Sequence, residues 1–225
     1  MKKKIIAIDG PAGAGKSTVA QIVGQHLNYT YIDTGAMYRA IAWKVLQEGL
    51  TVSDTASIIS IAQSITIKLT YIDGKTKVFV DEHDVTADIR DPRVSGIVSE
   101  IAQFAAVRQA MVSLQQSMAE QGGVVMDGRD IGTYVLPNAD IKIFLTASIE
   151  ERAQRRWREL TNKGFIVSVE EVARDIAARD KKDCERKISP LIQAPDAILL
   201  DTTGISIEST VIAILRICEE RQNFV

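Results

Sequence analysis

The sequence predicts an α/β fold in which a parallel sheet is covered by helices on both faces. Three observations lead to this prediction. Short apolar runs of strand length alternate with longer segments of helical periodicity. The runs are apolar throughout, which is typical of strands buried on both faces. A glycine-rich turn joins the first run, residues 5–8, to the first helical segment. Ligands of such sheets bind at the carboxyl ends of the strands.

The first part of the chain alternates strand and helix. In the helix expected at 15–27, Val19, Val23 and Leu27 recur every four residues and form one apolar stripe. Gly49 follows the second helix as its expected C-terminal cap. The expected elements are a strand at 4–9, a helix at 15–27, a strand at 29–33, a helix at 36–48 and a short helix near 54–63.

The middle of the chain interrupts this alternation. Residues 65–71 alternate apolar and polar, Asp73-Gly74 is a turn signal, and 77–80 is a second strand, which together predict an inserted hairpin. Helix and strand then return, and capping boxes beginning at Ser148 and Ser168 open two of the helices. The expected elements are helices at 94–121, 148–162, 168–188 and 205–221, and strands at 124–126, 141–145 and 197–200.

The glycine-rich turn has the sequence G-P-A-G-A-G-K-S-T and matches the phosphate-binding pattern G-x-x-x-x-G-K-[ST]. The glycines let several backbone N–H groups face one concavity, and the following helix adds the positive end of its dipole. Lys16 is then expected to reach the β- and γ-phosphates, and Ser17 to serve Mg²⁺ bound with ATP. The predicted ATP-binding residues are Gly10, Pro11, Ala12, Gly13, Ala14, Gly15, Lys16, Ser17 and Thr18.

Composition limits the class of protein. The formal net charge is −2, which lacks the basic excess of nucleic-acid-binding proteins. Cys184 and Cys218 have no C-x-x-C or histidine partner nearby, so we expect no disulfide or zinc site and a reducing cytoplasm. The apolar run after the first lysines ends at Asp9, too short for a signal peptide, and no run is long enough to span a membrane. A monomer of one domain, residues 1–225, is the expectation.

Polar residues follow four of the expected strands and should meet at one edge of the sheet. Arg39 and Arg129 belong to two of these runs, and they are candidates for an anion beyond the P-loop phosphates. Either arginine alone is also explained as a solvated surface charge. Asp33 and Asp127 end two strands. They either help to hold Mg²⁺ or simply terminate the strands, and the sequence does not separate the two readings.

Two charged helices complete the candidate site. Arg179, Asp183 and Arg186 are spaced to share one face of the helix at 168–188. They would offer phosphate and sugar ligands, or form an exposed ion-pair row worth about 0.3–0.5 kcal/mol per pair. In the helix at 148–162, Arg152 and Arg156 form a like-charge pair that an anionic ligand would relieve. This pair and the following glycine-containing stretch suggest a mobile arginine lid, about 150–168.

The motifs resemble those of the bacterial cytidylate kinases, within the nucleoside monophosphate kinase group of P-loop kinases. The resemblance runs nearly end to end. Its specific elements are D-G-R-D-I-G-T at 127–133 and R-D-K-K-D-C-E-R at 179–186, with D-T-G-A-M-Y-R at 33–39 shared more widely. It implies a three-layer P-loop NTPase fold with a five-stranded parallel sheet, a helical lid and a monophosphate-binding insert, about 63–95, with a small antiparallel sheet.

The resemblance also implies roles by position. Cytosine would be met by Ser99, Arg108 and Asp130. The ribose would be met by Asp183 with Arg179 beside it, and the acceptor phosphate by Arg39, Arg129 and Arg186. Thr34 takes the place of a serine common in relatives and joins the CMP-binding set. The implied catalytic residues are Lys16, Arg129, Arg186, Arg152 and Arg156, and the implied metal-associated residues are Ser17, Asp33 and Asp127.

The implied reaction moves the γ-phosphoryl of ATP to CMP or dCMP. The chain departs from the family pattern at Ala105-Ala106, where a polar residue is expected near Arg108. The nearest alternative is another P-loop small-molecule kinase that phosphorylates AMP or UMP. A regulatory GTPase requires N-K-x-D, and Asn162-Lys163 is followed by glycine and phenylalanine, without the aspartate. The two specific motifs favour cytidylate as the acceptor.

Overall fold

The computed structural model describes residues 3–72 and 75–221. The chain divides into two compact units. The first unit comprises Met1–Tyr31 and Gln121–Val225, and the second comprises Ile32–Glu120. The insert expected at about 63–95 therefore forms part of the second unit.

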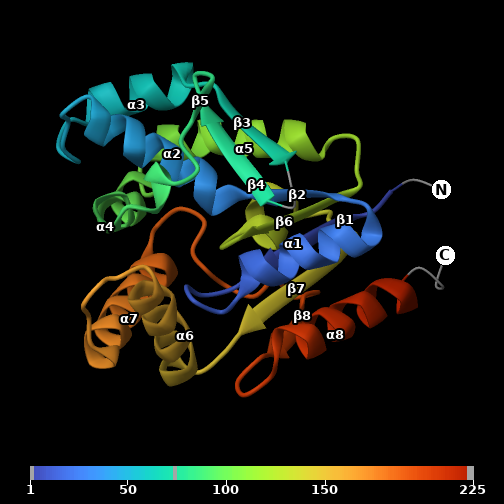
Figure 1. Ribbon diagram of the computed structural model, residues 1–225. Helices are drawn as coiled ribbons and strands as arrows, with labels where there is room; N and C mark the ends of the chain where they lie inside the picture. Colours follow the sequence, from blue (N-terminus) through green and yellow to red (C-terminus); the bar gives the residue numbers. More distant parts are fainter. Residues whose placement is uncertain (1–2, 73–74, 222–225) are drawn as a thin grey trace. The chain divides into compact units, whose positions relative to one another are not determined.

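A five-stranded sheet has the strand order β2-β6-β1-β7-β8 (Figure 1). β1 pairs in parallel with β6 and β7, and β7 pairs in parallel with β8. The predicted parallel sheet is therefore confirmed. The strands are β1 (Ile5–Asp9), β2 (Thr30–Asp33), β6 (Val124–Gly128), β7 (Ile141–Thr146) and β8 (Ile198–Asp201).

Helices α1 (Lys16–Leu27) and α8 (Ile207–Glu220) of the first unit pack on this sheet through one apolar core. Val19 and Val23, from the predicted stripe, are 2% and 0% exposed, and Ile214 joins them against the strands. Removing such side chains from water is the main stabilising term of the unit. The helices are α1 (Lys16–Leu27), α6 (Ile149–Asn162), α7 (Val169–Glu185) and α8 (Ile207–Glu220), with a single π-helical turn, η2 (Ile131–Val135).

Helices α6 and α7 lie side by side and have a small core of their own (Figure 1). Ala153 of α6 packs there with Val172 and Ile176 of α7. Both predicted serine caps are present: Ser148 Oγ accepts from Glu151 N at 3.2 Å, and Ser168 forms the complete, reciprocal capping box with Glu171. The caps satisfy backbone donors that have no partner inside a helix.

The second unit combines helices with a small antiparallel sheet of order β3-β4-β5. The pairing of β3 with β4 confirms the predicted hairpin, whereas its predicted turn, Asp73-Gly74, lies outside the described residues. The elements are α2 (Thr34–Gln47), α3 (Thr55–Ser64), β3 (Ile67–Ile72), β4 (Lys75–Val80), β5 (His83–Asp84), the 3₁₀ turn η1 (Asp88–Arg90), α4 (Pro92–Ile101) and α5 (Ala105–Ala119).

Two predicted helices are wrong in their extent. The single helix expected at 94–121 is broken, because Phe104 has an extended backbone between α4 and α5. Ile101 and Val107 are both fully buried, although six residues in a continuous helix turn the chain by about 240°. The break reorients the chain so that both side chains enter the core. Helix α7 ends at Glu185, so Arg186 (φ −62°, ψ 139°) lies beyond it and not on its face.

The turn from β1 into the P-loop is unusually close to the neighbouring strand. Gly10 has φ 148°, and a Cβ atom added there would lie 1.9 Å from the backbone oxygen of Leu145 in β7. A residue with a side chain would have to displace that strand. The first glycine of the loop is therefore required by the packing of β1 against β7.

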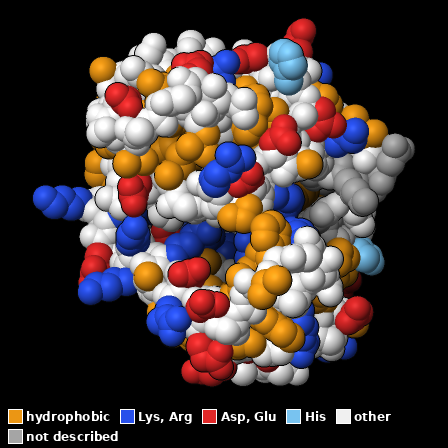
Figure 2. All heavy atoms as spheres, turned by 60° about the vertical axis from the view of Figure 1, so that its left-hand side comes forward, with side chains coloured by type: hydrophobic (Ala, Val, Ile, Leu, Met, Phe, Trp, Pro, Cys, Tyr) orange, Lys and Arg blue, Asp and Glu red, His pale blue; other side chains and the backbone are white. Residues whose placement is uncertain are grey.

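On the face shown in Figure 2, Asp and Glu are interspersed with Lys and Arg, so this face is not uniformly basic. No helix formed by residues 3–72 or 75–221 combines the length and the apolar character needed to cross a membrane.

Candidate active site

The P-loop lies between β1 and α1, and Lys16 is the first residue of the helix. The Lys16 side chain is only 5% exposed overall, and its Nζ donates to the backbone oxygen of Pro11 at 2.7 Å. Burial, followed by the nearby charge of Arg129, lowers the pKa of Lys16 to about 7 against the opposing effect of Asp127. A phosphate anion in the loop would favour the charged amine.

Ser17 and Asp127 form an oxygen-rich pair beside the P-loop. Ser17 Oγ donates to Asp127 Oδ2 at 3.0 Å, and Tyr31 Oη donates to the other carboxylate oxygen at 2.8 Å. Asp127 is 4% exposed at the end of β6. Hydroxyl and carboxylate oxygens are the ligands and water-binding groups that Mg²⁺ prefers. The donor set therefore fits the predicted metal association of Ser17 and Asp127.

Asp33 has a different environment, in the second unit. Its Oδ1 accepts from Ala36 N at 2.7 Å and so caps α2, while its Oδ2 accepts from Arg39 Nη2 at 3.0 Å. Both carboxylate oxygens are thus engaged within the unit. This arrangement explains the aspartate at the end of β2 as a helix cap that also orients an arginine.

A buried network of charges follows β6. Arg129 Nε donates to Asp183 Oδ2 at 2.9 Å, and Arg186 Nη2 lies 3.3 Å from Asp130 Oδ1. Burial alone would raise the pKa of Asp183, but Arg129, Arg179 and Arg186 outweigh it and the pKa is lowered. For Arg129, burial would lower the pKa, and Asp183 with other carboxylates raises it instead. Both residues of the pair are therefore charged at neutral pH.

The predicted residues of R-D-K-K-D-C-E-R are brought together without sharing one helical face. Asp183 lies on α7, whereas Arg186 lies past its end and donates from Nε to the backbone oxygen of Ser189. Arg179 is half-buried on α7, close enough to influence the pKa of Asp183 and of Lys16. The structure thus gathers these residues near the P-loop by ending the helix early.

The lid arginines correct one sequence-based expectation. Arg152 and Arg156 do not form an unrelieved like-charge pair, because each has its own carboxylate. Arg152 Nη1 contacts Asp180 Oδ2 at 2.5 Å, and Arg156 Nη1 contacts Glu159 Oε2 at 2.6 Å. Arg152 is 4% exposed and also donates to the backbone oxygens of Ala147 and Ala12. It therefore belongs to the fixed surroundings of the P-loop.

The second unit holds the other predicted acceptor residues. Arg108 on α5 is 2% exposed, and its guanidinium carbon lies 5.7 Å from the ring centre of Tyr38 on α2, within cation–π range. Arg39 Nε is buried without a hydrogen-bond partner in the described part of the chain. Thr34 begins α2 and is buried, and Ser99 lies half-buried on α4. All four predicted residues belong to the second unit.

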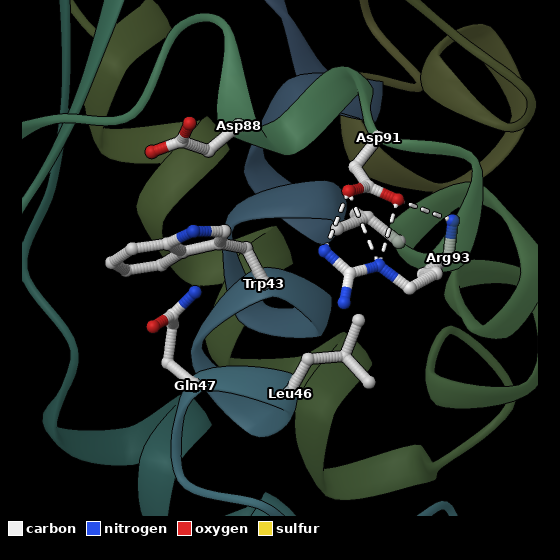
Figure 3. A pocket seen from close by; sticks show the side chains of 7 residues that line it. Trp43, Leu46, Gln47, Asp88, Asp91 and Arg93 are labelled. Atoms are coloured by element: carbon white, nitrogen blue, oxygen red, sulfur yellow. Dashed lines mark hydrogen bonds and ion pairs between the residues drawn. The ribbon is translucent and has the colours of Figure 1, made fainter.

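A separate pocket of about 220 Å³ also lies within the second unit, on α2, η1 and α4 (Figure 3). In Figure 3, the Trp43 ring lies between Asp88 and Gln47, and Asp91 is engaged by Arg93. None of the residues that line it is among the predicted site residues. The lining residues are Trp43, Leu46, Gln47, Asp88, Asp91, Arg93 and Val94.

Two carboxylates near the P-loop were missed by the sequence reasoning. Asp180 Oδ1 accepts from Ala12 N at 3.3 Å while its Oδ2 holds Arg152. Asp9, the last residue of β1, accepts backbone hydrogen bonds from Ile131 and Gly132. Asp180 stands inside a motif already singled out, and Asp9 directly precedes the P-loop. For Asp9, an acidic residue at the end of a buried apolar run was the available signal.

Comparison with known proteins identifies close relatives. The sequence model of the family described as Cytidylate kinase matches residues 6–220. The chain is 52% identical over 222 residues to the cytidylate kinase of Lysinibacillus sphaericus, covering 98% of this chain and 99% of that protein. It is 54% identical over 222 residues to the cytidylate kinase of Desulfitobacterium hafniense, covering 98% and 95%.

Similarity to solved structures supports the fold alone. A shikimate kinase from Bacteroides thetaiotaomicron aligns with a TM-score of 0.50 at 14% sequence identity, covering 96% of this chain and 98% of that one. The two share an arrangement of helices on a parallel sheet.

Proposed function

Because the chain belongs to the cytidylate kinase family, it is an ATP-dependent kinase of CMP or dCMP, and we propose how its residues divide that work. The observation that carries the proposal is the adjacency of β1 and β6. The two strands pair in parallel, with Asp9 beside Gly128. The P-loop leaves the end of β1, and the D-G-R-D segment leaves the end of β6. Donor and acceptor groups therefore emerge at one edge of the sheet.

In this proposal ATP is held by the P-loop, Gly10 to Thr18. Lys16 leaves the Pro11 carbonyl and binds the phosphates, which restores the charge that burial disfavours. Ser17 and Asp127 hold Mg²⁺, directly or through water, and the ion neutralises charge on the phosphates. Asp33 is assigned to Arg39 and to the cap of α2, because both of its oxygens are already engaged there.

The residues that the family motifs name for the acceptor nucleotide are assigned roles within their own units. In the first unit, Arg129 and Arg186 bind the phosphate of CMP, and Asp183 with Arg179 binds the ribose. Their support is the buried network of alternating charges described above. In the second unit, Arg39 also binds the phosphate. Its buried Nε, which has no hydrogen-bond partner among residues 3–72 and 75–221, is a donor suited to an anion.

The base is assigned to Asp130, Arg108 and Ser99, with Thr34 completing the CMP-binding set. Cytosine presents an exocyclic amine where uracil presents a carbonyl oxygen. An ionised Asp130 accepts hydrogen bonds only, so it can bind the amine of cytosine and repels the carbonyl oxygen of uracil. The burial of both Asp130 and Arg108 strengthens such discrimination, because a mismatched polar group there cannot form a hydrogen bond to water instead.

The chemical step requires positioning and charge neutralisation. The acceptor phosphate is itself the nucleophile, so no strong general base is needed. Lys16 and the arginines offset the repulsion between two anionic groups and the charge that develops on the transferred phosphoryl. Arg152 and Arg156 are assigned to this task from α6. Arg152 is already placed at the P-loop, while Arg156 must first leave Glu159.

The deciding experiment is a coupled assay of ADP release with ATP and Mg²⁺, run with CMP, dCMP, UMP and AMP. Fast turnover with CMP and dCMP and much slower turnover with the other two is expected. Faster turnover with UMP or AMP would retain the kinase reaction and contradict the base-reading roles. Absence of turnover with all four acceptors would overturn the proposal.

We also propose that the enzyme acts as a monomer in the cytoplasm. Both cysteines are free thiols, and Cys184 is exposed, which suits a reducing compartment. Light scattering coupled to gel filtration is expected to give a mass close to 24.7 kDa. A mass twice as large would contradict the monomer.

A further inference from the structure

Asp9 holds the backbone that follows the D-G-R-D segment. It is the last residue of β1, and only 5% of it is exposed. Its Oδ1 accepts from Ile131 N at 2.8 Å, and its Oδ2 accepts from Gly132 N at 2.7 Å. Each carboxylate oxygen thus binds one of two consecutive N–H groups, and these come directly after Asp130.

These two N–H groups need a partner from outside their own turn. They begin η2, and the first N–H groups of a helical turn have no acceptor within it. Ile131 and Gly132 are buried, so water does not replace a missing acceptor. Asp130 O already accepts from Tyr134 N and Val135 N farther along the turn. Asp9 is therefore the acceptor that fixes where the turn starts.

The segment is also confined on its other side. A Cβ atom added to Gly132 would lie 3.1 Å from Lys142 Cδ and 3.4 Å from Asp9 Oδ2. Lys142 is itself held by the Pro137 backbone oxygen at 2.6 Å and by Asp196 Oδ2 at 2.8 Å. The turn thus fits between Asp9 and an anchored lysine side chain. Small displacements of Asp130 are opposed from both directions.

We propose that Asp9 is a positioning residue for acceptor recognition, acting through the backbone of Ile131 and Gly132 on the orientation of Asp130. The proposal rests on the proposed function, in which Asp130 reads cytosine. Asp9 contacts neither nucleotide in this role. Because Gly10 follows it directly, the same strand end starts the P-loop and aligns the base-reading segment. The end of β1 thereby positions both the P-loop and the base-reading segment in the first unit.

The test replaces Asp9 with Asn, which keeps the shape and removes one acceptor. An amide group then faces one of the two N–H donors. The Michaelis constant for CMP is expected to rise about 10-fold and the preference for CMP over UMP to fall by a similar factor, as for one lost buried hydrogen bond. The Michaelis constant for ATP is expected to change less than about 3-fold, since the P-loop hydrogen bonds are retained.

Asp140→Asn is the matched control. Asp140 Oδ2 accepts from Ile5 N at 2.7 Å, so it makes the same kind of carboxylate–backbone bond at the other end of β1. Its kinetic constants are expected to stay within about 2-fold of the wild type, whatever happens to its melting temperature. A purely structural Asp9 would lower stability and leave the CMP-to-UMP ratio unchanged, which would overturn the proposal. An equal loss for ATP and CMP would overturn it as well.

A second measurement covers the case in which Asp9→Asn does not fold. Burial raises the pKa of Asp9 to about 6, against the two backbone hydrogen bonds, with Asp130 and Lys16 as the facing charges and Lys142 across the turn. A protonated Asp9 offers one acceptor fewer. The wild-type CMP-to-UMP ratio should therefore fall as the pH drops below about 6. Both substrates carry the same phosphate, so its titration cancels in the ratio.

A ratio that stays flat between about pH 5 and 8 would contradict the positioning role. Failure of the proposed function looks different, because the wild-type enzyme would then show no preference for CMP at any pH. The two outcomes are read from the same series of assays.

Discussion

Arg152 Nη1 donates a hydrogen bond of 3.0 Å to the backbone oxygen of Ala12, which ties helix α6 to the P-loop. Asp180 of α7 closes the arrangement, because one of its oxygens binds Arg152 and the other accepts from Ala12 N. The start of α6 is therefore anchored. The same contacts hold the Asp180 turn of α7 beside the P-loop.

Replacement of Arg152 tests this anchoring. Arg152→Ala is expected to lower the free energy of unfolding by about 2–4 kcal/mol, because it leaves Asp180 Oδ2 and two backbone oxygens without the Arg152 donor. Urea denaturation measures this change. Arg156→Ala is the matched stability control, since its ion pair with Glu159 is partly exposed and should contribute about 0.5 kcal/mol or less. Equal effects of the two substitutions would contradict the anchoring role.

Lys16→Met separates catalysis from stability. The turnover number is expected to fall by about 100-fold or more, because the phosphates lose a positioned charge. The ligand-free protein should become no less stable, since burial lowers the pKa of Lys16 to about 7 and the charged amine is disfavoured there. A large drop in the melting temperature of the variant would indicate a structural lysine.

The pH dependence of this effect has a defined sign. Between the folded pKa of about 7 and the ordinary value of 10.5, the unfolded state binds more protons, so Lys16 makes the wild type more stable as the pH rises. Below about 7 the full cost of burying the charge is present. The difference in melting temperature between Lys16→Met and the wild type should therefore be larger at pH 7 than at pH 9.5.

Asp183→Asn tests the buried pair with Arg129. The Michaelis constant for CMP is expected to rise more than that for dCMP, because the carboxylate is assigned to the ribose hydroxyls. Stability should also fall, since the lowered pKa of Asp183 reflects a charge stabilised in the folded state. That contribution is present above the ordinary pKa of 3.8 and is lost as the pH falls through the lower folded value.

The control for this substitution is Asp175→Asn, an exposed residue of the same helix. It should change neither the melting temperature nor the ratio of the two Michaelis constants. Equal increases for CMP and dCMP with Asp183→Asn would contradict a contact with the 2′-hydroxyl, the one group that distinguishes the two acceptors.

Asp130→Ala tests base reading. The preference for CMP over UMP is expected to fall by about 10-fold or more, because a matched buried contact is removed. The affinity for ATP should change far less. Steady-state assays with both acceptors and with varied ATP measure the two effects. Selectivity that survives the substitution would assign the discrimination to Arg108 and Ser99.

The sequence predicted those elements that are determined by neighbouring residues along the chain. The apolar run, the glycine pattern and the four-residue stripe predicted β1, the P-loop and α1, and serine caps marked the starts of α6 and α7. The break at Phe104 was missed because no proline or glycine marks it. It arises from the burial of both Ile101 and Val107, which depends on the rest of the unit.

The candidate site was likewise predicted only in part from the sequence. The family motifs named the residues near the P-loop, but not the partners that hold them. Arg152 was expected to repel Arg156, and its actual partner, Asp180, is 28 residues away in the sequence. Asp9 and Ile131 are 122 residues apart. Pairs of this kind depend on the packing of strands and helices and leave no periodic trace in the sequence.

The closeness of Gly10 to Leu145 affects how variant libraries of this protein are interpreted. A screen that measures enzyme output alone would group Gly10 with the phosphate-binding positions, because any side chain there abolishes the product. A screen of protein abundance would instead group Gly10 with the sheet core, since its Cβ would meet the Leu145 oxygen at 1.9 Å. Substitutions of Lys16 should lower the enzyme output and leave the protein abundance unchanged. Comparing the two screens would thus divide one short motif into residues that build the loop and residues that act on its ligand.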